Sequence, residues 1–276
     1  MPPRCHTAEV DHLEPEQLDV DGRRMSYRRA GAGDPLVLLH GGWSDSRAWS
    51  HQLGSLSDDF DVLAFDVPGC GGSDDPPGPV PFAWYADAVA DLIDTLDLGP
   101  VHLGGLSFGA GLALAFAQRY PAKVRSLVLA GAYAGWAGSL PADEVAARLT
   151  RLRGELARPP SEWADAYLAE FFHTDPGPEP TELFRTMLHS VRPAGTLPMI
   201  EAFAAADLRP GLAGLDRPTL LMVGEHDVRA PLPVARAIHA ALPDSRLVVV
   251  PGVGHDVHVE APGFFEREVR AFLAGL

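Results

Sequence analysis

The chain has 276 residues, 46% of them hydrophobic and 21% charged, which is enough to bury a large core in one domain with an insertion or in two domains. Its net charge of -15 argues against a nucleic acid or an anionic membrane surface as the partner. No apolar run approaches the length of about 18 residues that spans a membrane, and the N-terminus lacks the apolar core of a signal peptide. We therefore expect a soluble, cytoplasmic protein.

The only cysteines are Cys5 and Cys70. Cys5 belongs to a polar lead-in that ends near residue 15, and Cys70 lies in a glycine-rich turn. A pair placed in this way does not suit a disulfide framework. We expect both thiols to be free, as in a reducing compartment.

Strands and helices are predicted to alternate over the first 130 residues. Short alternating patterns on both sides of Asp21-Gly22 indicate a hairpin. Residues 35–39 form a continuous apolar run, typical of a strand buried on both faces, and further strands are predicted at 60–65, 101–106 and 124–130. Helical spacing is found after Trp43 to about residue 56, from about 82 to 96, and from 108 to about 120. This alternation predicts right-handed crossovers and a mostly parallel sheet flanked by helices.

The alternation stops between residues 131 and 215. That segment contains no convincing strand, and helical patterns are found at 142–156, 161–172, 181–189 and 197–206. We predict a helical cap over the ligand-binding edge of the sheet, with an ordinary helical layer as the alternative. Strands resume at 219–223 and 246–250, before a last helix. The predicted domains are thus a core of residues 1–130 and 216–276 and a cap of residues 131–215.

The sequence G-L-S-F-G, residues 105–109, stands where a buried strand meets a helix. It fits the G-x-S-x-G nucleophile elbow, in which a sharp turn holds the serine in a strained conformation. Only glycine fits two residues before and two residues after such a serine. The alternative is a tight turn with a capping serine, but the apolar strand before it and the small residues after it favour the elbow.

Several separated motifs support the same interpretation in the same chain order. They are His40-Gly41-Gly42, a glycine-rich loop that begins at Asp66, the elbow, G-E-H-D at 224–227 and G-V-G-H at 252–255. In these motifs the chain resembles the α/β-hydrolase family, in its serine-nucleophile branch with a helical cap, from about residue 16 to the end. The resemblance implies an α/β fold with a mostly parallel central sheet, an inserted helical cap and a catalytic triad. It does not imply a substrate.

The triad residues follow from chemistry and chain order. A serine hydroxyl needs an adjacent base, and histidine suits this role because its ordinary pKa lies near 6.5. In this fold the order is serine, acid, histidine, which predicts Ser107, Asp227 after a later strand, and His255 after the last strand. Glu225 is the rival acid, for which a solvated loop position is the better prediction. His258 is the rival base, for which a surface or packing role is the better prediction.

The oxyanion hole needs two backbone N–H groups that point at the developing charge. Phe108, directly after the nucleophile, is predicted to supply one of them. Gly42 is predicted to supply the other, with Trp43 as the alternative. His40 is expected to hold this loop together by hydrogen bonds, and Asp66 to shape the turn that follows it.

The remaining predictions concern the pocket and bound groups. The predicted substrate pocket consists of Trp43, Trp136, Phe171, Phe203 and Val228, although helices use such side chains for their cores as well. The glycine-rich loop lacks the pattern of a phosphate or dinucleotide site. The spacing of His255 and His258 matches no zinc pattern. We therefore predict neither a metal nor a cofactor.

Three functions remain. The first is a serine hydrolase that cleaves a small-molecule carboxylic ester or lactone through an acyl-enzyme on Ser107. The second is a carbon–carbon hydrolase of activated diketones, which shares the fold and the triad. The third is a non-hydrolytic ligand receptor, or a cofactor-free oxygenase or lyase. Ser107 excludes the branch of the family that uses aspartate at the elbow, and no oligomeric state is predicted.

Overall fold

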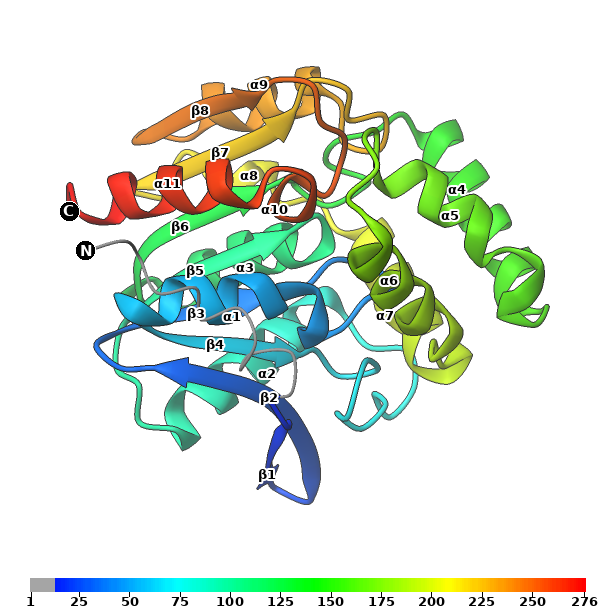
Figure 1. Cartoon of the computed structure of the whole chain (residues 1–276), viewed down its shortest axis with the longest axis horizontal. Coiled ribbons are helices and arrows are strands. Elements are labelled where there is room, and N and C mark those ends of the chain that lie inside the picture. Colours follow the sequence, from blue (N-terminus) through cyan, green and yellow to red (C-terminus); the bar gives the residue numbers. More distant parts are fainter. Residues whose placement is uncertain (1–12) are drawn as a thin grey trace.

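The computed structural model describes residues 13–276, which form an eight-stranded sheet with helices on both faces (Figure 1). The strand order is β1-β2-β4-β3-β5-β6-β7-β8. The strands β1 and β2 pair antiparallel, as do β2 and β4, and every other pair is parallel. The bounds are β1 Glu16–Val20, β2 Arg23–Gly31, β3 Asp34–Leu39, β4 Phe60–Asp66, β5 Val101–Leu106, β6 Val124–Ala130, β7 Thr219–Gly224 and β8 Ser245–Val250.

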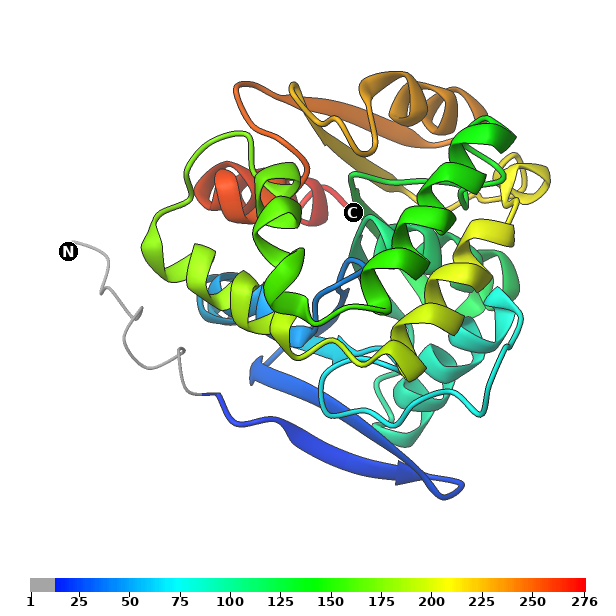
Figure 2. The same ribbon diagram turned by 90° about the vertical axis from the view of Figure 1, so that its right-hand side faces the viewer.

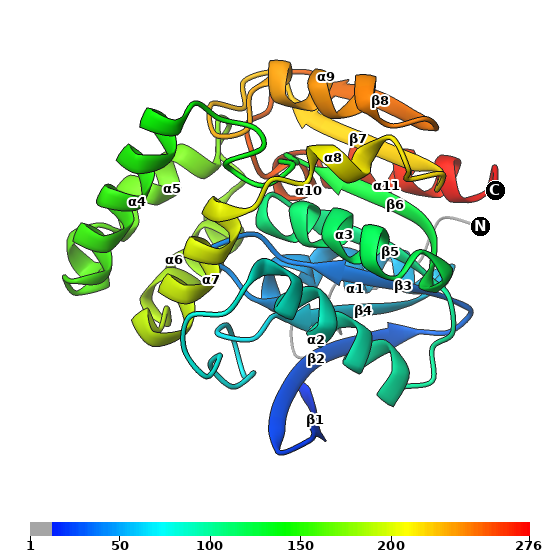
Figure 3. The same cartoon turned by 180° about the vertical axis from the view of Figure 1, so that it is seen from behind.

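Each face of the sheet has its own helices and its own core. The helices α1, α10 and α11 cover one face (Figure 1), and α2, α3, α8 (Arg209–Leu212) and α9 cover the other (Figure 3). Strand β3 is apolar at successive positions because both of its faces are buried. Leu36 and Leu38 pack into one core, and Val37 and Leu39 pack into the other. The bounds are α1 Ser50–Ser55, α2 Phe82–Thr95, α3 Phe108–Arg119, α9 Leu232–Ala241, α10 Val257–Glu260 and α11 Pro262–Leu273.

The predicted hairpin and parallel strands are confirmed. Asp21 and Gly22 have φ angles of 53° and 78°, the left-handed conformation that a tight hairpin turn needs. The predicted helix after Trp43 is broken into α1 and two flanking 3-10 turns, Ser46–Trp49 and Leu56–Asp58. Further 3-10 turns are Pro121–Lys123 and Pro160–Glu162.

Only helices connect β6 to β7 in this fully described segment. They are α4 Ala142–Leu156, α5 Ala164–Phe171, α6 Pro178–His189, α7 Pro193–Ala205 and α8 Arg209–Leu212. The first four lie beyond the edge where the parallel strands end (Figure 2), whereas α8 packs on α3 and α9. The helix α7 begins earlier than the sequence pattern predicts, since Pro193 supplies the fixed φ that suits a first helical turn.

Cys70 is buried and free, and burial raises the pKa of its thiol. Cys5 and most of the predicted lead-in lie outside the described residues, so the expectation about this cysteine stays a prediction. Within residues 13–276, no helix combines the length and the apolar character needed to cross a membrane.

Candidate active site

Ser107 occupies the turn between β5 and α3 with φ 54° and ψ -108°. A positive φ is rare for a residue with a side chain and marks stored strain. The flanking glycines are sterically required: a Cβ on Gly105 would lie 2.4 Å from the carbonyl carbon of Gly109, and one on Gly109 would lie 2.2 Å from the carbonyl oxygen of Leu39. The turn therefore has the geometry that the elbow motif predicts.

His255 and Asp227 form a buried pair at the ends of two other strands. His255 Nδ1–H donates to Asp227 Oδ2 at 2.8 Å. Asp227 Oδ1 accepts from the backbone N–H groups of Arg229 and Ala230, each at 2.8 Å. Burial raises the pKa of the Asp227 carboxyl, but the charge and hydrogen bond of His255, together with these backbone donors, outweigh burial and lower it. The carboxylate is thus ionised and fixed in orientation.

Gly131, the residue after β6, lies directly behind this pair. Its φ is +51°, and a Cβ at this position would lie 2.8 Å from His255 Cε1 and 3.4 Å from Asp227 Oδ2. The imidazole therefore fits only because this position has no side chain. Gly131 was not among the predicted site residues, although a glycine directly after a predicted buried strand marks a place where another group can approach the backbone closely.

The loop that carries His255 is bonded to the end of α5. The N–H of His255 donates to the carbonyl of Phe171 at 3.2 Å. The Glu260 carboxylate accepts from the N–H of Gly254 and from that of His173, each at 2.8 Å. Helix α5 and the histidine loop are therefore held together as one unit.

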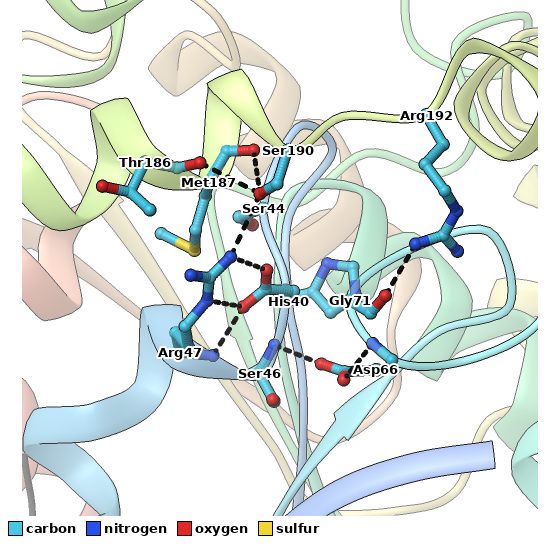
Figure 4. A network of polar contacts seen from close by, with 12 residues as sticks. His40, Ser44, Ser46, Arg47, Asp66, Gly71, Thr186, Met187, Ser190 and Arg192 are labelled. Atoms are coloured by element: carbon cyan, nitrogen blue, oxygen red, sulfur yellow. Dashed lines mark hydrogen bonds and ion pairs between the residues drawn. The ribbon is translucent and has the colours of Figure 1, made fainter. Parts of the chain in front are cut away.

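His40 and Asp66 hold the loop that contains Gly41 and Gly42, and Figure 4 shows the bond between Asp66 and Ser46. His40 Nδ1–H donates to the carbonyl of Gly41 at 2.7 Å, and its Nε2 accepts from the N–H of Val67 at 3.1 Å. Asp66 Oδ1 accepts from the N–H of Ser46 at 2.7 Å. Among the described residues, the backbone N–H groups of Gly42, Trp43 and Phe108 have no hydrogen-bond acceptor, which is what an oxyanion site requires.

Two arginines connect the α6–α7 region to the core in the same view (Figure 4). Arg192 Nη1 donates to the carbonyl of Gly71 at 2.6 Å, and Arg47 Nη2 donates to Ser190 Oγ at 3.2 Å. Together with the Glu260 contacts, these bonds fix the helical segment to the core on two sides of the site.

Ser107 and His255 line one cavity of about 30 Å³, which has room for little more than water. A second cavity of about 270 Å³ lies beside it, and both cavities are lined by Trp43, Trp136, Ile200 and Arg229. Of the predicted pocket residues, Phe171 and Phe203 line the first cavity with Trp43 and Trp136. Val228 is 74% exposed and lines only the second.

The two rival residues lie apart from the pair. Glu225 is exposed and accepts from the N–H of Gly252 at 2.9 Å. His258 is fully buried against Trp49, and burial lowers its pKa to about 3. Neither residue lines either of the two cavities.

Asp256 is an acidic residue of the site that was not among the predicted site residues. It lines the first cavity and is only 2% exposed. Burial raises the pKa of its carboxyl to about 7, against the lowering effects of His255 and Arg229. The cavity therefore contains a carboxyl group beyond that of the buried pair.

A sequence profile described as the alpha/beta hydrolase fold matches residues 34–262. The chain belongs to the α/β hydrolase family. The family resemblance and the fold class predicted from the motifs are thus confirmed. Like its named relatives, this α/β hydrolase is a hydrolytic enzyme. Its sheet and helices place Ser107 and His255 on one cavity, with the Asp227 carboxylate bonded behind His255.

This α/β hydrolase is similar over nearly its full length to proteins with different named activities. A 2-hydroxy-6-oxo-2,4-heptadienoate hydrolase of Pseudomonas putida is 30% identical and covers 92% of this chain and 94% of its own. A thermophilic esterase from Thermogutta terrifontis is 27% identical with a TM-score of 0.85, and the match covers 95% of this chain and 98% of the esterase. The enol-lactonase from Burkholderia xenovorans is 27% identical with a TM-score of 0.82, and the match covers 94% of this chain and 100% of the lactonase.

Proposed function

We propose that this α/β hydrolase cleaves small-molecule carboxylic esters or lactones through an acyl-enzyme on Ser107. The observation that carries the proposal is the common cavity of Ser107, held at φ 54°, and His255, whose other nitrogen is bonded to the buried Asp227. A strained serine next to an oriented base is the arrangement that nucleophilic acyl transfer needs.

The chemistry has two halves. Because His255 Nδ1–H is bonded to Asp227, the lone pair of Nε2 is free to accept the Ser107 proton as Oγ attacks the carbonyl carbon. The resulting imidazolium then protonates the leaving alcohol, and an acyl ester on Ser107 remains. Water attacks that ester with His255 again as the base, which releases the acid and restores the serine.

The developing oxyanion is assigned to the N–H groups of Phe108 and Gly42, with Trp43 as the alternative to Gly42. Their lack of acceptors among the described residues supports this assignment. The helices α4 to α7 act as the cap over the site in this proposal, because side chains of α5, α6 and α7 line the Ser107 cavity and side chains of α4 line the cavity beside it.

The second candidate is hydrolysis of a carbon–carbon bond in an activated diketone, favoured by the 30% identity to the Pseudomonas putida hydrolase. The deciding experiment is turnover of three substrates, an aryl ester, a lactone and a vinylogous diketone, by the wild type and by Ser107→Ala. Ester and lactone turnover that depends on Ser107 supports the proposal. Turnover of the diketone alone favours the second candidate, and no turnover of any of the three favours a receptor or a cofactor-free oxygenase or lyase.

Trp136 is expected to limit the size of the acyl group, since it is common to both cavities. Trp136→Leu should join the two cavities and so favour a longer acyl group. We expect kcat/KM for p-nitrophenyl octanoate, divided by kcat/KM for p-nitrophenyl acetate, to rise by about tenfold, because apolar pockets discriminate between substrates on that scale. The matched control is Trp84→Leu, because Trp84 is half-buried under Arg23 and lines neither cavity. An equal change in both variants would mean that Trp136 has a packing role only.

Gly131→Ala should reduce kcat by about 100-fold. The methyl group of the alanine would displace the His255 imidazole, and a displacement of a reacting group by about 1 Å can lower the rate by about that factor. Gly99→Ala is the control: Gly99 has a similar φ of +65°, but its Cβ would meet no atom within 4 Å. Steady-state rates on an aryl ester, with melting temperatures, distinguish the outcomes. Equal kcat in both variants would contradict the proposed contact.

A further inference from the structure

Asp256 is a buried carboxylic acid in the catalytic cavity that the proposed reaction does not use. It lies directly after His255 and lines the same cavity as Ser107. An aspartate before a short helix normally accepts a hydrogen bond from the first helical N–H groups. Here the side chain makes no such bond to α10, and no hydrogen bond to its carboxyl is found among residues 13–276. Its hydrogen-bonding capacity is therefore free toward the cavity.

The charges around this carboxyl are mixed. His255 precedes it, Arg229 and Asp227 face it from the loop after β7, and Glu260 faces it from α10. The Arg229 guanidinium is itself paired with Glu170 at 2.9 Å, so it does not serve as a dedicated partner of Asp256. Burial with no partner costs an ionised carboxylate more than a neutral carboxyl.

We propose that Asp256, in its neutral form, donates a hydrogen bond to a second acceptor oxygen of the substrate. This inference rests on the proposed esterase function and narrows it to esters that carry a further carbonyl oxygen close to the scissile group. A neutral carboxyl has one O–H donor, whereas its carboxylate only accepts and would repel a carbonyl oxygen. Asp256 is thus a specificity-determining residue, and the preference it gives should disappear as it ionises.

The test compares matched esters with and without the extra oxygen. One pair has the ketone in the acyl group, p-nitrophenyl 4-oxopentanoate and pentanoate. The other has it in the alcohol, 3-oxobutyl and butyl benzoate. At pH 6 we expect kcat/KM of the wild type to be about fivefold higher for the oxo ester than for its partner in at least one pair. This factor corresponds to the net contribution of one neutral hydrogen bond. The preference should fall with a midpoint near pH 7 and be absent at pH 8.5.

Two variants test whether Asp256 is the cause. Asp256→Asn keeps a donor that does not titrate, so the oxo preference should persist at pH 8.5. Asp256→Ala has no donor and should lack the preference at every pH. The inference is wrong if the wild type shows no preference in either pair, or if the alkaline fall persists in Asp256→Asn.

A measurement without turnover separates this inference from the proposed function. Aspartate labelled with ¹³C at the carboxyl gives a resonance that Asp256→Asn identifies by its loss. We expect this resonance to titrate near pH 7 and to shift with 4-oxopentanamide but not with pentanamide. Titration near the ordinary value of about 4 would overturn the inference even if the esters are hydrolysed. If the resonance titrates near pH 7 and shifts with 4-oxopentanamide, but no ester is hydrolysed, only the proposed function would be overturned.

Discussion

Ser107→Ala should lower kcat on an aryl ester by about a million-fold, as loss of the nucleophile does in another serine hydrolase. The reason is the covalent step, because no other hydroxyl is assigned to attack in the proposed mechanism. The protein should remain folded, since the hydroxyl makes no hydrogen bond to any described residue and alanine fits the same space. A fluorophosphonate probe should label the wild type at Ser107 and leave the variant unlabelled.

Ser44→Ala is the matched control, as Ser44 lines the same cavity and the chemical change is identical. Its hydroxyl donates to the carbonyl of Gly41 at 3.0 Å, so its loss should cost less than about tenfold. Comparable losses in the two variants, or labelling that persists in Ser107→Ala, would rule out Ser107 as the nucleophile.

The fold was predictable because its signals are local. The strands of the parallel sheet are short and mostly apolar segments, and the turn at Asp21 and Gly22 carries its own conformational preference. The elbow could be recognised for the same reason, since the clashes that require Gly105 and Gly109 arise within one strand-to-helix turn and the strand beside it.

The cavity was less predictable because its walls come from segments distant in the sequence. Arg229 and Ile200 line both cavities, and neither was among the predicted pocket residues. Asp256 was not among the predicted site residues, and its neighbour His258, for which a surface or packing role was the better prediction, packs against Trp49 in the core. Burial of the Asp256 carboxyl depends on how α5 meets the histidine loop, which no local pattern encodes.

Asp227→Asn should lower kcat by about 10⁴-fold while the fold is retained, the loss known for the same change in another triad. Asp227 Oδ1 is held by the N–H groups of Arg229 and Ala230, each at 2.8 Å. The asparagine oxygen would keep those two bonds, so its NH₂ group must point at His255. Nδ1 would then have to accept, which places the imidazole proton on Nε2 and removes the base that Ser107 needs.

The comparison variant is Glu225→Gln, the same change of carboxylate to amide at an exposed residue only two positions away. Its bond to the N–H of Gly252 can be kept by an amide oxygen, so kcat should change by less than about threefold. The measurement is kcat on one aryl ester for both variants and the wild type, with circular dichroism to show that each is folded. A large loss in Glu225→Gln with a small one in Asp227→Asn would assign the acid to Glu225 instead. Equal and small losses would mean that His255 needs no carboxylate to orient it.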